Sequence, residues 1–311
     1  MLYEAMLLLI PFGIALFYGD GDSLAFLITI ILMIPCALLL RSIKIKEKGM
    51  YAKEGFFTVG ITWIVISVFG ALPFVISGAI PSFIDAFFET VSGFTTTGAS
   101  ILTDVEVLPK SLLFWRSFTH WIGGMGVLVL VTAVVPNIAD RSLNILKAEM
   151  PGPVVGKLVP RSRDTAKILY IIYFGMTAIL TVLLIAGGMS IFDSIVHAFG
   201  TAGTGGFGIK ADSIASYSPY LQWVITTFMF LFAINFNLYY LLLIGKFRAI
   251  FKSDELWFPA MNEEEIKELY GRLGIDVFGY IDGFFSIMLF DFEKKLFCIS
   301  QNIHSCWKSY M

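Results

Sequence analysis

Six apolar stretches of membrane length constrain this chain more than any other feature of its sequence. A bilayer core of about 30 Å requires about 20 mainly apolar residues in a helix. Stretches that meet this requirement run over residues 2–18, 24–40, 55–79, 112–135, 167–187 and 217–244. Hydrophobic residues make up 57% of the 311 residues and charged residues only 15%, a balance that a water-facing surface cannot accommodate. The sequence predicts an all-α polytopic membrane protein with six transmembrane helices and excludes a soluble one.

Charge and cysteine content exclude several classes of function. A formal net charge of −2 leaves no basic excess for binding nucleic acid. Cys36, Cys298 and Cys306 are not spaced as a disulfide framework or a metal site. The sequence contains no Ser/His/Asp set, phosphate-binding loop or paired carboxylates in a plausible site. We therefore expect no nucleic-acid partner, no enzymatic activity and no tightly bound cofactor.

Two further apolar stretches, residues 82–94 and 190–199, are too short to span a bilayer, and each precedes a segment rich in Thr and Gly. They are predicted to be re-entrant half-helices. Lys and Arg concentrate in residues 41–53, 136–167 and 246–252, which lie on one side if the six spans alternate. This bias places those loops and both termini in the cytoplasm, and both Thr/Gly segments then open outward.

Residues 53–136 and 167–246 share one plan: a membrane helix, a half-helix, a Thr/Gly segment and a second membrane helix. Gly-Phe-Thr-Thr-Thr-Gly-Ala-Ser at 93–100 aligns without a gap with Gly-Thr-Ala-Gly-Thr-Gly-Gly-Phe at 200–207, at an offset of 107 residues. This alignment matches Thr97-Gly98 with Thr204-Gly205. Repeat proteins in membranes commonly bind their substrate at the repeat interface, where the backbone is not helical.

The Thr/Gly segments indicate a cation path. Irregular backbone at membrane depth is tolerated only when it is buried in protein or lines a water-filled cavity. Glycine allows successive carbonyl groups to turn to one side, and such carbonyls replace the hydration shell of a monovalent cation. The half-helices would direct their partially negative C-termini to the same place. Close packing of helices through small residues is the alternative, and the duplication of the segment favours the cation path over it.

Four motifs resemble the Trk/Ktr/HKT superfamily of potassium transporters, most closely the membrane subunit of the bacterial Trk system. They begin with Asp-Ala-Phe-Phe-Glu at 85, Phe-Trp-Arg-Ser at 114, His-Ala-Phe-Gly at 197 and Asn-Phe-Asn-Leu at 235, and run through residues 85–100, 114–126, 197–207 and 235–240. The resemblance covers about residues 1–257. It implies a fold related to four helix–pore–helix repeats around one axis, each contributing one filter segment.

By this resemblance the chain divides into a leading helix pair (1–42), a first repeat (43–136), a cytoplasmic loop (137–166), a second repeat (167–257) and an unrelated tail (258–311). The implied selectivity-filter residues are Thr96, Thr97, Gly98, Ala99, Gly203, Thr204, Gly205 and Gly206. The resemblance also implies potassium transport through a multi-pass protein of the inner cell membrane. K⁺ is then the transported ion and the only metal bound, and the partners are lipid, a second copy of the chain and a cytoplasmic nucleotide-binding regulatory subunit.

The resemblance ends near Trp257, where a third and a fourth repeat would follow. The sequence therefore looks truncated after the second repeat, and the alternative interpretation is a truncated or fused, non-conducting fragment that acts as an interaction partner. In the tail, residues 262–273 read as a short helix and residues 284–291 and 295–299 as strands around a turn, a soluble α/β segment. Residues 262–300 weakly resemble a fragment of the glutamine-amidotransferase domain of asparagine synthetases. Its N-terminal nucleophilic cysteine is missing here.

Several polar residues within the apolar stretches have structural interpretations. Arg116 is expected to reach the interface or to pair with an acid such as Glu89, as an anchor rather than in ion handling. His120 and His197 are not at metal-ligand spacing and are expected to be neutral. Asn235 and Asn237 are expected to form hydrogen bonds between helices. The glycines near the end of residues 112–126 are expected to allow close helix contact, against the first half-helix.

Overall fold

The computed structural model describes residues 1–42, 52–124, 126, 162–234, 236–243, 287–291, 296–300 and 309–310. The chain divides into two units. The first unit comprises Met1–Met150 and Lys157–Phe236, and the second comprises Pro151–Gly156 and Asn237–Met311.

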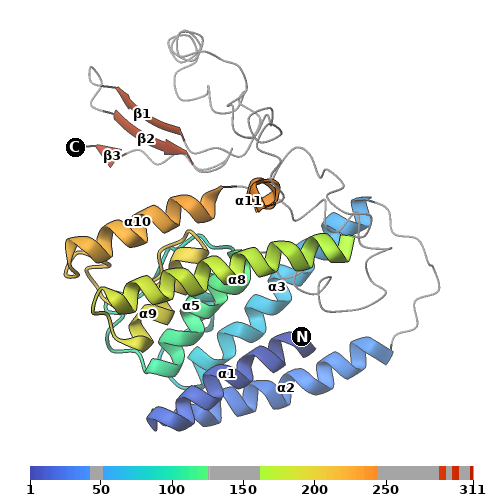
Figure 1. Ribbon diagram of the computed structural model, residues 1–311. Helices are drawn as coiled ribbons and strands as arrows, with labels where there is room; N and C mark the ends of the chain where they lie inside the picture. Colours follow the sequence, from blue (N-terminus) through green and yellow to red (C-terminus); the bar gives the residue numbers. More distant parts are fainter. Residues whose placement is uncertain are drawn as a thin grey trace. The chain divides into compact units, whose positions relative to one another are not determined.

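The first unit is helical (Figure 1). Its described helices are α1 (Leu2–Tyr18), α2 (Ser23–Ser42), α3 (Ala52–Ile76), α4 (Phe83–Phe94), α5 (Lys110–Gly124), α8 (Ser162–Ala186), α9 (Ile191–Ala202) and α10 (Pro219–Ala233). Helix α11 (Phe236–Leu243) begins with the last residue of the first unit.

Three of the described helices are long and apolar enough to cross a membrane, over Ser23–Leu40, Phe57–Ile76 and Lys167–Ala186. Leu2–Tyr18 and Pro219–Ala233 are shorter apolar helices. Helices α4 and α9 have 12 residues each, a length of about 18 Å, so a helix too short to span a bilayer lies at each of the two predicted positions. The second one ends at Ala202, three residues beyond the predicted boundary at 199.

The prediction of one continuous helix over residues 217–244 is wrong. Helix α10 ends at Ala233, Ile234 is extended (φ −73°, ψ 139°), and α11 starts at Phe236. The Ile234 N–H donates to the Leu231 carbonyl at 3.2 Å, a tight turn that closes the helix. Apolar residues continue on both sides of this break, and the asparagines Asn235 and Asn237 beside it are compatible with polar groups within one helix. The predicted span 112–135 begins at Lys110, and its part beyond Gly126 lies outside the described residues.

The same three-helix unit occurs twice. Helix α4 packs on α3 and α5, and α9 packs on α8 and α10. Each short helix starts at a serine cap: Ser82 accepts the Asp85 N–H and Ser190 accepts the Asp193 N–H, through their hydroxyl oxygens. Helix α5 also packs on α9, and this contact joins the two repeats.

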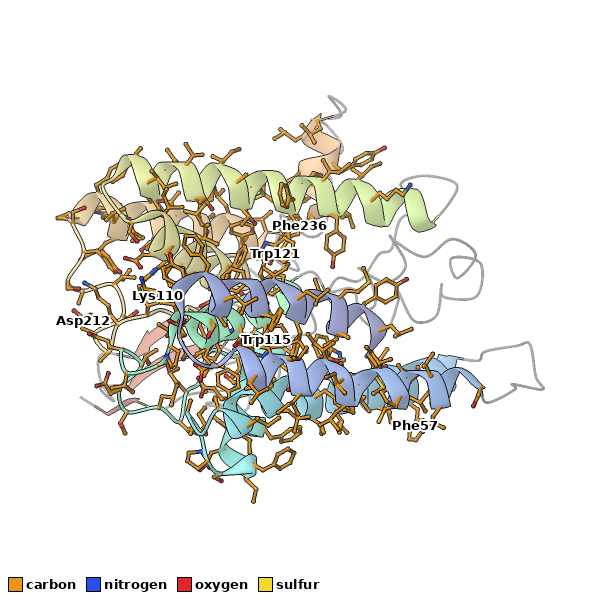
Figure 2. The ribbon with its side chains drawn as sticks, turned by 90° about the horizontal axis from the view of Figure 1, so that it is seen from below. Phe57, Lys110, Trp115, Trp121, Asp212 and Phe236 are labelled. Carbon is orange, nitrogen blue, oxygen red and sulfur yellow. The ribbon has the colours of Figure 1, made fainter. Side chains whose placement is uncertain are left out.

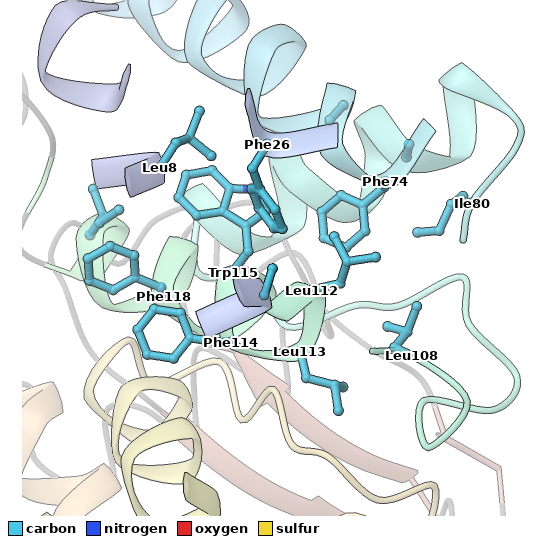
Figure 3. Packing of buried hydrophobic residues seen from close by; sticks show 14 of the residues in the cluster. Leu8, Phe26, Phe74, Ile80, Leu108, Leu112, Leu113, Phe114, Trp115 and Phe118 are labelled. Atoms are coloured by element: carbon cyan, nitrogen blue, oxygen red, sulfur yellow. The ribbon is translucent and has the colours of Figure 1, made fainter. Parts of the chain in front are cut away.

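Trp115 of α5 lies at the centre of the larger hydrophobic core (Figure 3). Its ring is fully buried, in a cluster that also contains Leu8 of α1, Phe26 of α2 and Phe74 of α3. Its Nε1–H donates to the Gly70 carbonyl at 2.9 Å. The core therefore fixes the leading hairpin and α3 around α5.

The outward faces of the helices are also apolar. Phe57 of α3 points away from the bundle in Figure 2 and is 70% exposed. Phe174 of α8 and Trp223 and Phe230 of α10 are similarly exposed. Such extensive exposed apolar surface is typical of lipid-facing helices.

In the second unit, β1 (Ile287–Asp291) pairs antiparallel with β2 (Leu296–Ser300), which pairs with β3 (Ser309–Tyr310). The register aligns Leu289 with Cys298, and the two strands overlap the strands predicted at 284–291 and 295–299. Residues 292–295, where the turn is predicted, lie outside the described residues. The helix predicted over 262–273 lies outside the described residues.

Candidate functional site: two irregular segments at the ends of the short helices

Helices α4 and α9 end in the same way. Thr95 and Gly203 cap them, with their N–H groups donating to Val91 and Phe199 carbonyls at 2.8 and 3.2 Å. The next residue is a threonine in the left-handed region in both cases, Thr96 with φ 55° and Thr204 with φ 56°. Two residues further on, a glycine has φ 76° or 77°. We call residues 96–99 the first segment and residues 203–207 the second segment.

These equivalences fix the repeat offset at 108 residues, and the predicted offset of 107 is wrong. Thr97-Gly98 corresponds to Gly205-Gly206 rather than to Thr204-Gly205. Gly203 has helical dihedrals (φ −76°, ψ −2°) and corresponds to the helix cap Thr95. The backbone conformation of each segment depends on its distance from the serine N-cap of the short helix, and the two N-caps are 108 residues apart. The sequence alignment gave 107 because it matched the Thr-Gly pairs by residue type.

The two segments lie against each other. A Cβ added to Gly98 would overlap the Gly205 carbonyl oxygen. A Cβ added to Gly205 would lie 2.7 Å from the Thr96 carbonyl oxygen and would overlap the His120 ring. Because real Cβ atoms do not approach so closely, only glycine allows this arrangement at both positions. Two of the predicted filter glycines are therefore brought together across the repeats.

Helix α5 supports both segments through its C-terminal glycines. A Cβ on Gly123 would overlap the Phe94 carbonyl oxygen at the end of α4, and one on Gly124 would lie 3.1 Å from the Ala202 carbonyl oxygen at the end of α9. The predicted glycine contact with the first half-helix is confirmed, and the contact with the second half-helix was not predicted.

A buried ion pair lies behind the segments. Arg116 Nε donates to Glu89 Oε1 at 2.6 Å, and the two side chains are 4% and 0% exposed. The predicted pairing of Arg116 with Glu89 is therefore confirmed. Glu89 also accepts hydrogen bonds from the Ser100 hydroxyl (2.9 Å) and the Ile101 N–H (3.0 Å).

Arg116 makes two contacts with the other repeat that the sequence did not suggest. Its Nη1 donates to the Gly208 carbonyl at 3.0 Å, and its guanidinium carbon lies 3.5 Å from the centre of the Phe207 ring. His120, one turn later on α5, places its ring centre 3.9 Å from that of Phe207. Phe207 of the second repeat is thus close to two side chains of the first repeat.

Other predicted polar residues are placed less fully. His197 is buried, and its Nδ1 lies 3.0 Å from the Asp193 carbonyl oxygen on its own helix. Asn235 and the side chain of Asn237 lie outside the described residues. Within the described ranges no group of His, Cys, Asp and Glu side chains is arranged to hold a metal ion.

Comparison with known proteins places this architecture in a family. The family profile described as "TrkH: Cation transport protein" matches residues 23–255. The chain belongs to this TrkH family. The Trk system potassium uptake protein TrkH of Escherichia coli (strain K12) is 38% identical over 251 residues, covering 79% of this chain and 52% of that protein. TrkG of the same strain is 37% identical over 241 residues, covering 76% and 50%.

The fold agrees with this membership. The crystal structure of the potassium transporter TrkH from Vibrio parahaemolyticus superimposes with a TM-score of 0.66 at 29% identity, over 89% of this chain and 55% of that one. The chain thus spans about half the length of its TrkH relatives. These relatives are named as potassium uptake proteins and transporters, in agreement with a sequence that carries no enzymatic motif.

Proposed function

We propose that this chain is the membrane-spanning subunit of a Trk-type K⁺ uptake system, or a part of one, and that K⁺ passes along the carbonyl groups of the first and second segments. The proposed ion-binding residues are Thr96, Thr97, Gly98, Ala99, Gly203, Thr204, Gly205 and Gly206. The observation that carries this proposal is the duplicated backbone: two segments with matching left-handed positions, in contact across the repeats.

The chemistry of the segments supports a cation rather than an anion. Main-chain carbonyls are the ligands that replace the water around a monovalent cation. Each segment follows directly on the C-terminal end of a short helix, where the helix dipole contributes partial negative charge. The offset of 108 extends the second set by one residue, because the carbonyls equivalent to those of 96–99 belong to 204–207, with Gly203 at the helix cap.

The membrane arrangement follows from the same proposal. Six spans and two re-entrant half-helices would divide the chain into the leading pair (1–42), the repeats 43–136 and 167–257, the loop 137–166 and the tail 258–311. Both termini would be cytoplasmic in the inner membrane. The partners would be K⁺, lipid, a second copy of the chain and a cytoplasmic nucleotide-binding regulatory subunit. The β1–β2 hairpin is compatible with the asparagine synthetase-like origin proposed for the tail.

Rubidium uptake tests this function. The chain is expressed in a bacterial strain that lacks its own K⁺ uptake systems, and ⁸⁶Rb⁺ influx and growth at low K⁺ are measured. We expect uptake from the unaltered chain and none from Gly205→Ala, whose Cβ would displace the Thr96 carbonyl. Gly60→Ala on α3 is the matched control, since nothing lies within 4 Å of its added Cβ.

Two results would contradict the proposal. One is an absence of influx although the unaltered chain is present in the membrane, which would favour a non-conducting interaction partner. The other is equal influx through the unaltered chain and the Gly205→Ala variant, which would place the ion path elsewhere.

A further inference from the structure

The Glu89–Arg116 ion pair contacts structurally equivalent points in the two repeats. With the offset of 108, Ser100 corresponds to Gly208. Glu89 accepts the Ser100 hydroxyl at 2.9 Å, and Arg116 donates to the Gly208 carbonyl at 3.0 Å. A single ion pair therefore holds the outer ends of both segments, directly after residues 99 and 207.

Among the described residues, no hydrogen bond from the second repeat's own helices corresponds to the one between Glu89 and Ser100. The residue equivalent to Glu89 is His197, whose Nδ1 faces the Asp193 carbonyl of its own helix. After the first segment, Glu89 accepts hydrogen bonds from the Ser100 hydroxyl and the Ile101 N–H. After the second segment, the Gly208 carbonyl accepts a hydrogen bond from Arg116, which belongs to the first repeat. The asymmetry makes the spacing of the two segments depend on Arg116.

Burial and stacking make this link stiff. The side chains of Glu89 and Arg116 are almost completely excluded from solvent, and a charge-assisted hydrogen bond in such surroundings is shorter and stronger than one in water. The guanidinium carbon also lies over the Phe207 ring, 3.5 Å from its centre. Lysine at this position could keep the charge next to Glu89 but could not supply a planar group that binds Glu89 and Gly208 together and stacks on the ring.

We propose that Glu89 and Arg116 are positioning residues that set the separation of the two filter segments and thereby the preference for K⁺ over Na⁺. This inference rests on the proposed function, because it concerns the carbonyl ligands assigned there. A carbonyl site selects its ion by cavity size and by the number of ligands, so a change in segment spacing changes selectivity before it abolishes transport.

The test measures the spacing and the selectivity separately. Spin labels are attached at Thr103→Cys and Ala215→Cys, two exposed positions in the loops after the segments, in a chain whose three native cysteines are replaced by serine. Double electron–electron resonance gives the distance distribution between the labels. The variants are Arg116→Lys and the double variant Glu89→Gln/Arg116→Gln, which removes both charges together and avoids leaving one buried and unpaired. Trp115→Phe is the control, since Trp115 is fully buried on the same helix but bonds only to Gly70 among the described residues.

We expect a narrow distribution in the unaltered chain and in Trp115→Phe, and a broadened or displaced one in both pair variants. In the uptake assay, the ratio of Rb⁺ to Na⁺ influx should fall roughly tenfold in Arg116→Lys, the equivalent of about 1.4 kcal/mol. Unchanged label distances in both pair variants would overturn the inference, whether or not the chain transports ions. Changed distances with an unchanged influx ratio would overturn the link to selectivity. Failure of the unaltered chain to transport refutes the proposed function instead, and the label distances still decide the role of the pair.

Discussion

Replacing Gly98 with alanine is predicted to push the two segments apart, whereas the same replacement at Gly78 adds only backbone strain. Both glycines have nearly the same left-handed backbone, with φ 76° and 77°. Alanine in this region costs about 1–2 kcal/mol because its Cβ approaches the carbonyl oxygen that follows. At Gly78 nothing lies within 4 Å of the added Cβ, so this cost is the whole effect.

At Gly98 the added Cβ would also overlap the backbone of Gly205. Backbone cannot rotate aside as a flexible side chain can, so the segment as a whole has to shift. Overpacking of this kind costs roughly 1–3 kcal/mol in well-packed interiors. We therefore expect Gly98→Ala to destabilise the protein by about 2–5 kcal/mol, the sum of the two costs, and to remove any stabilisation that K⁺ provides through the site.

The assay is thermal unfolding of the detergent-solubilised protein, followed by the fluorescence of its six tryptophans, in KCl and in choline chloride. Ligand that binds only the folded state raises the melting temperature. The unaltered chain and Gly78→Ala should both gain stability in KCl, with the Gly78→Ala curve shifted down at both salts. Gly98→Ala should melt lowest and show no difference between the salts. Equal melting temperatures and equal K⁺ responses in the two variants would refute the contact between the segments.

Three further predictions follow from other contacts. Gly123→Ala on α5 should abolish ⁸⁶Rb⁺ uptake, because its Cβ would overlap the carbonyl oxygen at the end of α4, while Gly175→Ala in the open on α8 should retain uptake; equal uptake by both would contradict the close packing of α5. Tyr173→Phe should lower the free energy of unfolding by about 0.5–1.5 kcal/mol, because the Tyr173 hydroxyl donates to the Trp121 carbonyl at 2.9 Å. An unchanged melting temperature would show that this hydrogen bond does not stabilise the folded state. Burial, with a smaller contribution from neighbouring Asp20, raises the pKa of the Asp22 carboxyl in the loop between α1 and α2, so the folded state loses stability as pH rises through that raised pKa. Asp22→Asn should therefore raise the melting temperature at pH 7 and have no such effect near pH 3.5, and a gain of equal size at both pH values would contradict this assignment.

The sequence predicted the elements whose causes are local. Apolar runs bounded by charge, Gly or Pro gave α1, α2, α3 and α8, and a run too short to span a membrane gave each of the two half-helices. For Arg116 the sequence left two alternatives open, reaching the interface or pairing with an acid such as Glu89, and the structure shows the pair. The Thr/Gly composition located both irregular segments.

Features that depend on contacts between distant parts of the chain were out of reach. The predicted offset of the repeats differs from the observed one by one residue, because the alignment matched Thr-Gly pairs by residue type. The observed backbone conformation instead depends on the distance from the serine N-caps Ser82 and Ser190. The break at Ile234 lies in a mainly apolar run, and the two asparagines after it, Asn235 and Asn237, are equally compatible with polar contacts inside a continuous helix. The hydrogen bond from Arg116 to Gly208 joins residues 92 apart, and no local pattern encodes it.

In the proposed mechanism, carbonyl groups of the two segments bind a monovalent cation. Crystals grown in RbCl and measured near the rubidium absorption edge test it most directly, since anomalous difference density locates Rb⁺ without reference to the protein. We predict peaks beside residues 96–99 and 204–207, within coordination distance of their carbonyl oxygens, and their loss in Gly205→Ala. Rubidium density confined to other parts of the chain, in a protein that takes up Rb⁺, would contradict the account.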